Sequence, residues 1–295
     1  MQSIKPDILD SPFHLADPDI LSRVVWKRIA NKNWLVTTAS VAAAEALVAP
    51  EATEGADATA KGVEADPTLF EVAEIHAIAT VATDGCYLSP DGGFPTAGGP
   101  GELAKIALTF QATAPRVGSK YAAAYTKSFG ALRQIVDLAR TPTYGYKGTL
   151  DWKSLRPGFK LRHAPFRIPD AGDDDDKGSY ELSEWPVKSE LAREGIQSME
   201  GKYVVDRLCA YDFDGRIIAP EDYTKKLPGA SIAVTFNMTH YSFTSQQQDT
   251  FVADIVKIRV IESQVAPPPS PRKRRPVVPD MDESPKKKKT RAAGA

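Results

Sequence analysis

The pattern of apolar and polar residues along the chain predicts more strand than helix. Apolar and polar positions alternate over Phe70–Ala82 and Leu103–Ala112, and again over Ile196–Ala219, Ser231–Thr244 and Phe251–Ile261. Alternation with a period of two residues is typical of strands. A short polar stretch separates the last two segments, so we expect these two strands to form a hairpin.

Two segments have the spacing of a helix instead. Apolar residues recur every three or four positions in Lys120–Arg140, which predicts a helix with its rings packed on a sheet and its cations outward. A similar spacing after the Asp-Pro-Asp sequence at 17–19 predicts a short helix over Asp17–Asn33. The stripe of the longer helix consists of Tyr121, Tyr125, Phe129, Leu132 and Val136.

These elements predict a mainly β protein with some α, of the α+β class, built on an OB-type twisted barrel with one or two helices and long loops. Its domain spans residues 1–265, with a mobile loop at about 42–66 that is rich in Ala, Glu, Gly and Thr, and an acidic loop at about 170–178. Residues 266–295 are Pro-rich and basic, which is typical of a disordered tail.

Positive charge is concentrated between Pro115 and Arg167. Eleven Lys and Arg residues in this segment face two acidic ones, a net charge of +9, whereas the whole chain has a net charge of -1. Eight aromatic residues lie among these cations. Cations that follow a phosphate backbone, together with rings that stack on bases, are what a protein needs to bind single-stranded nucleic acid without reading its sequence.

Ten residues of this segment are therefore candidates for nucleic-acid binding. Trp152 and Phe159 lie in its non-helical part, where an exposed ring has less reason to belong to the core, and they are the candidates for stacking. The alternative interpretation is a charged surface that is merely solvated. The candidates for phosphate contacts are Lys120, Lys127, Lys147, Lys153, Arg156, Lys160, Arg162 and Arg167.

No motif indicates catalysis, a metal site or a cofactor, and we expect none of the three. The four histidines and two cysteines lack the spacing of metal ligands, and the glycine-rich loop 90–101 lacks the Gly-Lys-Ser/Thr of a phosphate-binding loop. Four consecutive aspartates at 173–176 cannot all face one ion, so they predict an exposed loop that either shields the binding groove or is inert. No apolar run reaches the roughly 20 residues of a membrane span, so we expect no membrane partner.

Four segments near the C-terminus form a series of strands and turns, namely Gly201–Asp206, Arg216–Asp222, Leu227–Phe236 and Thr250–Ile261. This succession, over roughly residues 196–262, resembles the end of phage-type single-stranded-DNA-binding proteins. In that family, such strands close an OB barrel. The resemblance implies a non-catalytic protein of DNA replication, recombination or mobile-element biology. That family typically ends in an acidic tail, whereas this chain ends in a basic one.

The tail carries two basic clusters on a Pro-rich segment, a pattern typical of a two-part nuclear localisation signal. It predicts a nuclear protein with an import receptor as a partner. The alternative is a tail that only adds solubility. The residues of the predicted signal are Arg272, Lys273, Arg274, Arg275, Lys286, Lys287, Lys288 and Lys289.

The favoured hypothesis is a nuclear, non-catalytic protein that binds single-stranded DNA, with RNA binding and homo-oligomerisation left open. The second hypothesis is a nuclear protein-protein interaction module with no direct nucleic-acid contact. A third, an enzyme such as a nuclease, lacks a cluster of carboxylates with a histidine in the sequence.

Truncation after Val265 tests the interpretation of the tail. We expect the truncated protein to keep its thermal stability, because a disordered segment buries little surface, and to lose nuclear accumulation in a eukaryotic cell. It should keep most of its preference for single strands. Nuclear retention of the truncated protein would contradict the localisation signal, and loss of DNA binding would assign binding to the tail.

Overall fold

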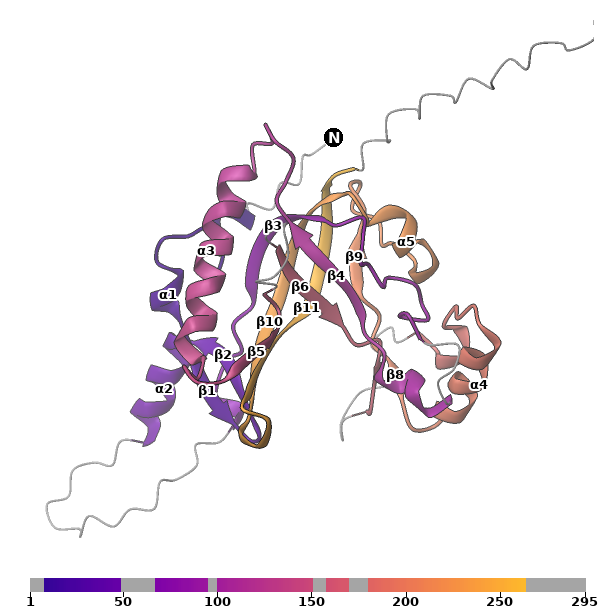
Figure 1. Cartoon of the computed structure of the whole chain (residues 1–295), viewed down its shortest axis with the longest axis horizontal. Coiled ribbons are helices and arrows are strands. Elements are labelled where there is room, and N and C mark those ends of the chain that lie inside the picture. Colours follow the sequence, from indigo (N-terminus) through magenta and orange to yellow (C-terminus); the bar gives the residue numbers. More distant parts are fainter. Residues whose placement is uncertain (1–7, 49–66, 95–99, 151–157, 170–179, 264–295) are drawn as a thin grey trace, which may run out of the picture. The chain divides into compact units, whose positions relative to one another are not determined.

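A nine-stranded sheet dominates the part of the chain that the structure describes (Figure 1). The computed structural model describes residues 8–48, 67–94, 100–150, 158–169 and 180–263. The chain divides into a unit of Met1–Gln264 and a segment of Val265–Ala295. All the described residues belong to the first unit, which is a mixed α/β structure with a few helices.

The strands of the large sheet are β1 (Val24–Ile29), β2 (Lys32–Thr37), β3 (Ile75–Val81), β4 (Leu108–Thr113), β5 (Gly145–Gly148), β6 (Gly158–His163), β9 (Cys209–Tyr211), β10 (Ser231–Phe243) and β11 (Gln248–Glu262). A separate two-stranded sheet pairs β7 (Phe166–Arg167) with β8 (Val204–Val205). The α-helices are α1 (Ile20–Arg23), α2 (Thr38–Val48), α3 (Ala122–Ala139), α4 (Glu190–Met199) and α5 (Tyr223–Lys226).

Five of the strands pair in a ring. Strand β3 pairs with β10 and β4, β4 pairs with β6, and β11 pairs with β10 along its whole length. The ring closes between β6 and β11 at one pair of residues, Arg162 and Asp254. Strands β1, β2, β5 and β9 extend the sheet beyond this ring, so the sheet does not form a simple closed barrel. The predicted OB-type barrel is therefore confirmed only in part.

The predicted C-terminal hairpin is confirmed. Strands β10 and β11 pair in antiparallel register from Ser231 opposite Glu262 to Phe243 opposite Gln248. Val234, Phe236 and Met238 are fully buried on one face of β10, as their alternation predicts. The long predicted helix is also confirmed as α3.

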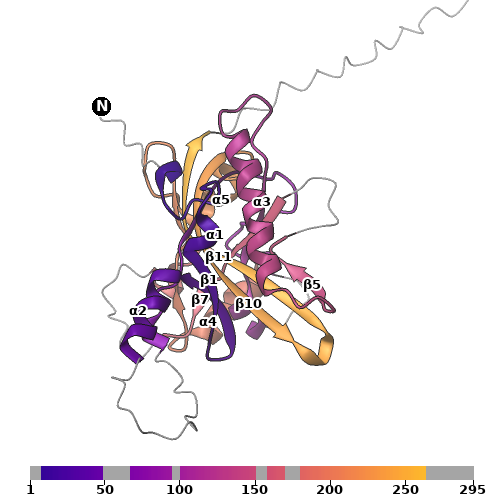
Figure 2. The ribbon, with the colours of Figure 1, turned by 90° about the vertical axis from the view of Figure 1, so that its left-hand side faces the viewer.

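Helix α3 packs its predicted stripe against the core, with α1 and β3 as neighbours (Figure 2). Tyr125, Leu132 and Val136 are buried, and the Tyr125 Oη donates a hydrogen bond of 3.2 Å to the carbonyl oxygen of Ala112 in β4. This bond satisfies the hydroxyl of a ring that is otherwise surrounded by apolar side chains. Burial raises the pKa of Tyr125, so the hydroxyl stays protonated and able to donate.

The N-terminal region corrects two predictions. A helix over Asp17–Asn33 is wrong, because only Ile20–Arg23 is helical and β1 and β2 form a hairpin from Val24 to Thr37. The β-branched and aromatic residues of Val24–Ile29 fit a strand well, and pairing along the edge of the large sheet outweighs their helical spacing. The mobile loop predicted at 42–66 is wrong at its start, because residues 42–48 belong to α2, and the rest lies outside the described residues.

The strand pattern predicted over Ile196–Ala219 is wrong at its start and is otherwise confirmed only in two short segments. Its first residues form the last turn of α4, and the only strands within that range are the short β8 and β9. Ser189 caps α4 by accepting a hydrogen bond from the Ala192 N–H, and Ile196 and Met199 are buried on the face of the helix. This spacing of apolar residues, three positions apart, begins before residue 196 and identifies the helix.

A buried polar cluster ties the long hairpin to β2. His240 Nδ1 lies 3.0 Å from Asn33 Nδ2, and His240 Nε2 lies 3.0 Å from Asp249 Oδ1. Burial opposes ionisation of Asp249, but bonds from the Thr141 N–H and from His240 hold the pKa of its carboxyl below the usual value. An ionised carboxylate only accepts, so His240 donates to it through Nε2. His240 is therefore a buried residue of the core.

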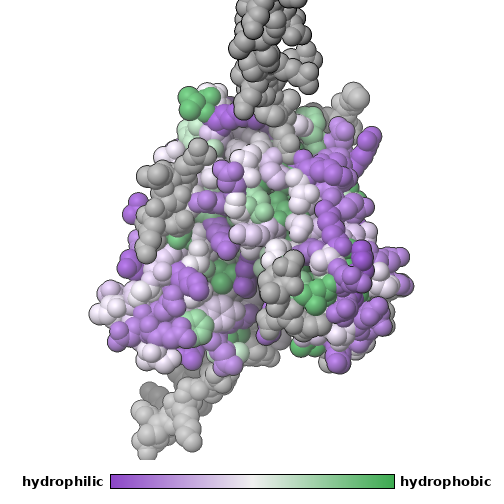
Figure 3. Space-filling view, turned by 45° about the vertical axis from the view of Figure 1, so that its right-hand side comes forward, coloured by the Kyte–Doolittle hydropathy of each residue, from purple (hydrophilic) through white to green (hydrophobic). Residues whose placement is uncertain are grey.

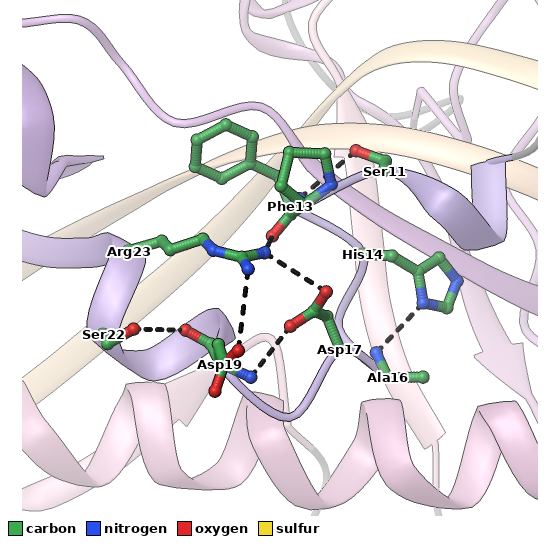
Figure 4. A network of polar contacts seen from close by, with 9 residues as sticks. Ser11, Phe13, His14, Ala16, Asp17, Asp19, Ser22 and Arg23 are labelled. Atoms are coloured by element: carbon green, nitrogen blue, oxygen red, sulfur yellow. Dashed lines mark hydrogen bonds and ion pairs between the residues drawn. The ribbon is translucent and has the colours of Figure 1, made fainter.

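A second polar network ties the N-terminal segment to α1 (Figure 4), while the backbone of Phe13 and Leu15 forms hydrogen bonds with His76 of β3. Arg23 donates to the carbonyl oxygen of Pro12 and forms an ion pair with Asp17, whose Oδ1 also accepts the N–H of Asp19. His14 is buried beneath this network, with Nδ1 accepting the N–H of Ala16. Burial and the nearby His76 lower the pKa of His14 from 6.5 to about 4, although Asp17 raises it in part.

This burial makes folding stability depend on pH. Between pH 6.5 and about 4 the unfolded chain binds a proton at His14 that the folded chain does not, so the free energy of unfolding should fall as the pH drops through this window. The loss from His14 is about 3 kcal/mol. We expect His14→Asn, which keeps an acceptor for the Ala16 N–H but does not titrate, to reduce the loss in urea unfolding measured across this range. An unchanged pH profile would exclude His14 as the titrating group.

Candidate nucleic-acid interface

Strand β6 separates its cations from its apolar side chains by simple alternation. Phe159, Leu161 and His163 are buried, whereas Lys160 is exposed and Arg162 is half-exposed on the opposite face. The outward positions of Lys160 and Arg162 agree with the sequence pattern. His163 faces inward, where its Nε2 lies 2.6 Å from the carbonyl oxygen of Asp206.

The neighbouring strands set the surroundings of these two cations. On β4, Thr109 lies opposite Arg162 and Gln111 lies opposite Lys160. On β11, Asp254 lies beside Arg162, and its Oδ1 accepts a hydrogen bond of 2.7 Å from the Arg162 Nε. Both side chains of this ion pair are about 40% exposed (41% and 39%), so its contribution to stability is small, but it occupies one edge of the guanidinium.

Strand β5 brings a third cation to the same region. It runs parallel to β11 beside the hairpin, with Lys147 opposite Thr250 (Figure 2). A side chain at Gly148 would collide with the backbone of Phe251, so only glycine permits this close approach. Beyond Gly148, the carbonyl oxygen of Thr149 accepts a hydrogen bond of 2.6 Å from the Lys160 N–H.

Lys147 and Lys160 thus lie on neighbouring segments of one surface. Both side chains are exposed, and in the described part of the chain neither pairs with a carboxylate. Two ammonium groups held this way present point charges to a backbone of phosphates without reading its bases.

Aromatic side chains continue this surface onto the hairpin. Tyr241 on β10 lies opposite Thr250 on β11, which in turn lies opposite Lys147, so the three residues form a row across three strands. The ring of Tyr241 stacks on that of Phe243 with centroids 6.3 Å apart, and Phe243 is 42% exposed. Exposed rings beside cations are the second requirement for binding single strands.

Phe159 corrects the sequence-based prediction of a stacking ring. Its side chain is fully buried and packs between Tyr125 of α3 and Phe236 of β10. The prediction failed because β6 begins directly after Pro157, so Phe159 occupies the inward position of a strand rather than a loop.

The structure separates other candidates from this surface. Lys120 and Lys127 are exposed on or beside α3, where Lys120 lies over the ring of Tyr121 at 4.9 Å, and Arg167 belongs to the small sheet of β7 and β8. Trp152, Lys153 and Arg156 lie outside the described residues. So do the acidic loop and the two basic clusters of the tail.

Several residues of the surface were not found from the sequence. The sequence predicts only that three of them belong to strands, namely Asp254, Tyr241 and Phe243. It places Tyr87 between two strands, and the structure shows this residue 54% exposed beside β4. The alternation of β10 and β11 does assign Tyr241 and Asp254 to the outward face. Their proximity to Lys147 and Arg162 depends on strand pairing, which alternation does not specify.

The surface offers a ligand two exposed ammonium groups and partly exposed aromatic rings. Within the described ranges, no three His, Cys, Asp or Glu side chains gather closely enough to hold a metal ion. No helix in those ranges combines the length and the apolar character that crossing a membrane requires. On the face seen in Figure 3, hydrophilic side chains predominate and hydrophobic ones appear in small groups.

No protein-family model matches the sequence, and no curated protein is significantly similar to it. Among solved structures, the chain is similar to the crystal structure of gp2.5, a single-stranded DNA binding protein encoded by bacteriophage T7, with 12% sequence identity and a TM-score of 0.34. The match covers 67% of this chain and 92% of that chain. A similarity at this level does not establish a shared fold, so the role of the surface is argued from its own residues.

Replacing Phe159 by Ala tests its assignment to the core. We expect Phe159→Ala to lower the free energy of unfolding by about 3–5 kcal/mol, as truncations of buried rings do, measured by urea denaturation. Phe243→Ala is the control, because that ring is partly exposed and its truncation should cost far less. Equal stability of the two variants would contradict the core assignment.

Proposed function

We propose that this chain is a non-catalytic protein that binds single-stranded DNA, without sequence preference, on the outward surface of β4, β5 and β6. The observation that carries the proposal is the exposure of Lys147 and Lys160 on adjacent segments of that surface, next to Arg162. A nucleic-acid strand laid across it meets cations on two strands in succession, and electrostatic attraction to phosphates supplies most of the affinity in sequence-independent binding.

The order of the ring supports an OB-type assignment. Counted along the chain, its five strands are β3, β4, β6, β10 and β11, so β4 and β6 are the second and third. In OB folds the face of the second and third strands binds oligonucleotides, together with the loops between strands one and two and between strands four and five. In this chain, Lys160 lies on the third strand of the ring, Tyr87 lies between the first and second strands, and the β10–β11 hairpin joins the fourth and fifth.

A preference for single strands follows from the exposed rings. Tyr241 and Phe243 lie in the same surface as Lys147, and bases stack on such rings only when they are unpaired. The proposal has two further parts. One is a role in replication, recombination or mobile-element biology, and the other is nuclear import through the tail. Both rest on the sequence.

Filter binding with single-stranded DNA, duplex DNA and RNA of equal length tests the proposal. We expect the single strand to bind most tightly, with a log-log salt slope of roughly -0.7 for each phosphate contact. Lys147→Gln and Lys160→Gln should each make the slope shallower by about 0.7. Asp254→Asn should strengthen binding, because it releases Arg162 for phosphate.

Lys225→Gln is the matched control, because Lys225 is an exposed cation of α5 that pairs with Asp222. It should leave the affinity and the slope nearly unchanged. Absent or salt-independent binding would contradict the proposed function, and would leave the alternative of a protein-protein interaction module. If Lys225→Gln weakens binding as much as Lys147→Gln and Lys160→Gln do, the binding site does not lie on this surface.

A further inference from the structure

Tyr87 presents an aromatic ring at the edge of β4. Its backbone pairs with Thr109, with the Tyr87 N–H 2.8 Å from the Thr109 carbonyl oxygen and the Thr109 N–H 3.1 Å from that of Tyr87. Cys86 and Leu88, on either side, pack toward the core, so the Tyr87 side chain points outward. It is 54% exposed.

A glycine backbone supports one side of this ring. Gly92 and Gly93 both have positive φ, 55° and 72°, a conformation that favours glycine. A Cβ atom at Gly93 would lie 2.6 Å from Tyr87 Cδ1, closer than any side chain permits. The ring therefore lies directly against the Gly93 backbone, and the residue remains 54% exposed to solvent.

Polar contacts hold this glycine turn in place. The two carboxylate oxygens of Asp91 accept hydrogen bonds of 2.8 and 3.0 Å from the N–H groups of Lys188 and Ser189, at the start of α4. The buried Trp185 donates from Nε1 to the carbonyl oxygen of Pro90 at 2.9 Å. A ring on such a support loses little conformational freedom when it binds a ligand, which favours affinity.

The register of the sheet aligns Tyr87 with the proposed DNA-binding cations. Residues directly opposite in antiparallel strands share a face, and Tyr87 lies opposite Thr109, which lies opposite Arg162. Two strand spacings separate Tyr87 from Arg162, roughly 10 Å between backbones. A phosphate at Arg162 or Lys160 and a base at Tyr87 can therefore belong to one strand of nucleic acid.

We propose that Tyr87 is a stacking site for an unpaired nucleobase, with the Gly92–Gly93 turn as its support. The inference rests on the proposed function and adds to it a residue that contacts the bases. Such a ring accepts any base, because every base has a π-face. It rejects duplex DNA, where that face is covered by the neighbouring base pair.

Two probes separate stacking from other roles of Tyr87: oligo(dT) and an abasic deoxyribose-phosphate strand of the same length. We expect Tyr87→Ala to weaken binding of oligo(dT) by about 5- to 150-fold and Tyr87→Phe to leave it nearly unchanged. On the abasic strand, the wild type and Tyr87→Ala should bind equally, because no base is present to stack. Tyr87→Leu keeps an apolar side chain over the glycine turn but has no aromatic ring. It should therefore bind oligo(dT) as weakly as Tyr87→Ala does.

Phe213→Ala is the matched control. Phe213 is 60% exposed on the turn after β9, a strand that pairs with β11 and not with β4. The Phe213→Ala variant should bind oligo(dT) as tightly as the wild type does. Absence of oligo(dT) binding by the wild type would contradict the proposed function itself. If the wild type binds, then full affinity of Tyr87→Ala, or a loss that persists on the abasic strand, would overturn the stacking site alone.

Discussion

Pairing between β10 and β11 is the interaction on which the rest of the sheet depends. The two strands pair from Ser231 opposite Glu262 to Phe243 opposite Gln248, and every other strand of the large sheet except β1 and β4 pairs with one of them. Strand β10 pairs with β2 and β3, and β11 pairs with β5, β6 and β9. A hairpin joined by a short turn forms at low cost in loop entropy, so it can template strands that are distant in sequence.

The candidate interface depends on that hairpin. Lys147 and Lys160 come from segments on either side of residues 151–157, and β11 brings both segments together through parallel pairing and the bonds of Thr149. Asp254 of β11 meets Arg162 where the ring closes. The same ion pair that helps to join β6 to β11 thus withdraws one cation from the surface, and phosphate has to compete with the carboxylate for it.

Three aspartates support this fold by accepting hydrogen bonds from backbone N–H groups. Asp91 binds two N–H groups at the start of α4, Asp249 binds the Thr141 N–H, and Asp212 accepts the N–H of Arg216 within a turn. Each bond satisfies a donor that the strands and helices leave unpaired. A chain with a net charge of -1 can still present a cationic surface, because these three aspartates lie outside β4, β5 and β6.

Elements with strong local patterns are predictable from the sequence alone. It predicted α3 from a stripe that includes Tyr125 and Leu132, and the β10–β11 hairpin from alternation, because periodicity is a local property of the chain. Tertiary structure decided the rest. Val24–Ile29 became a strand by pairing with β2, and Phe159 became a core residue through its contacts with Tyr125 and Phe236. The row from Tyr87 to Arg162 exists only through register, and register is set by contacts between segments far apart in sequence.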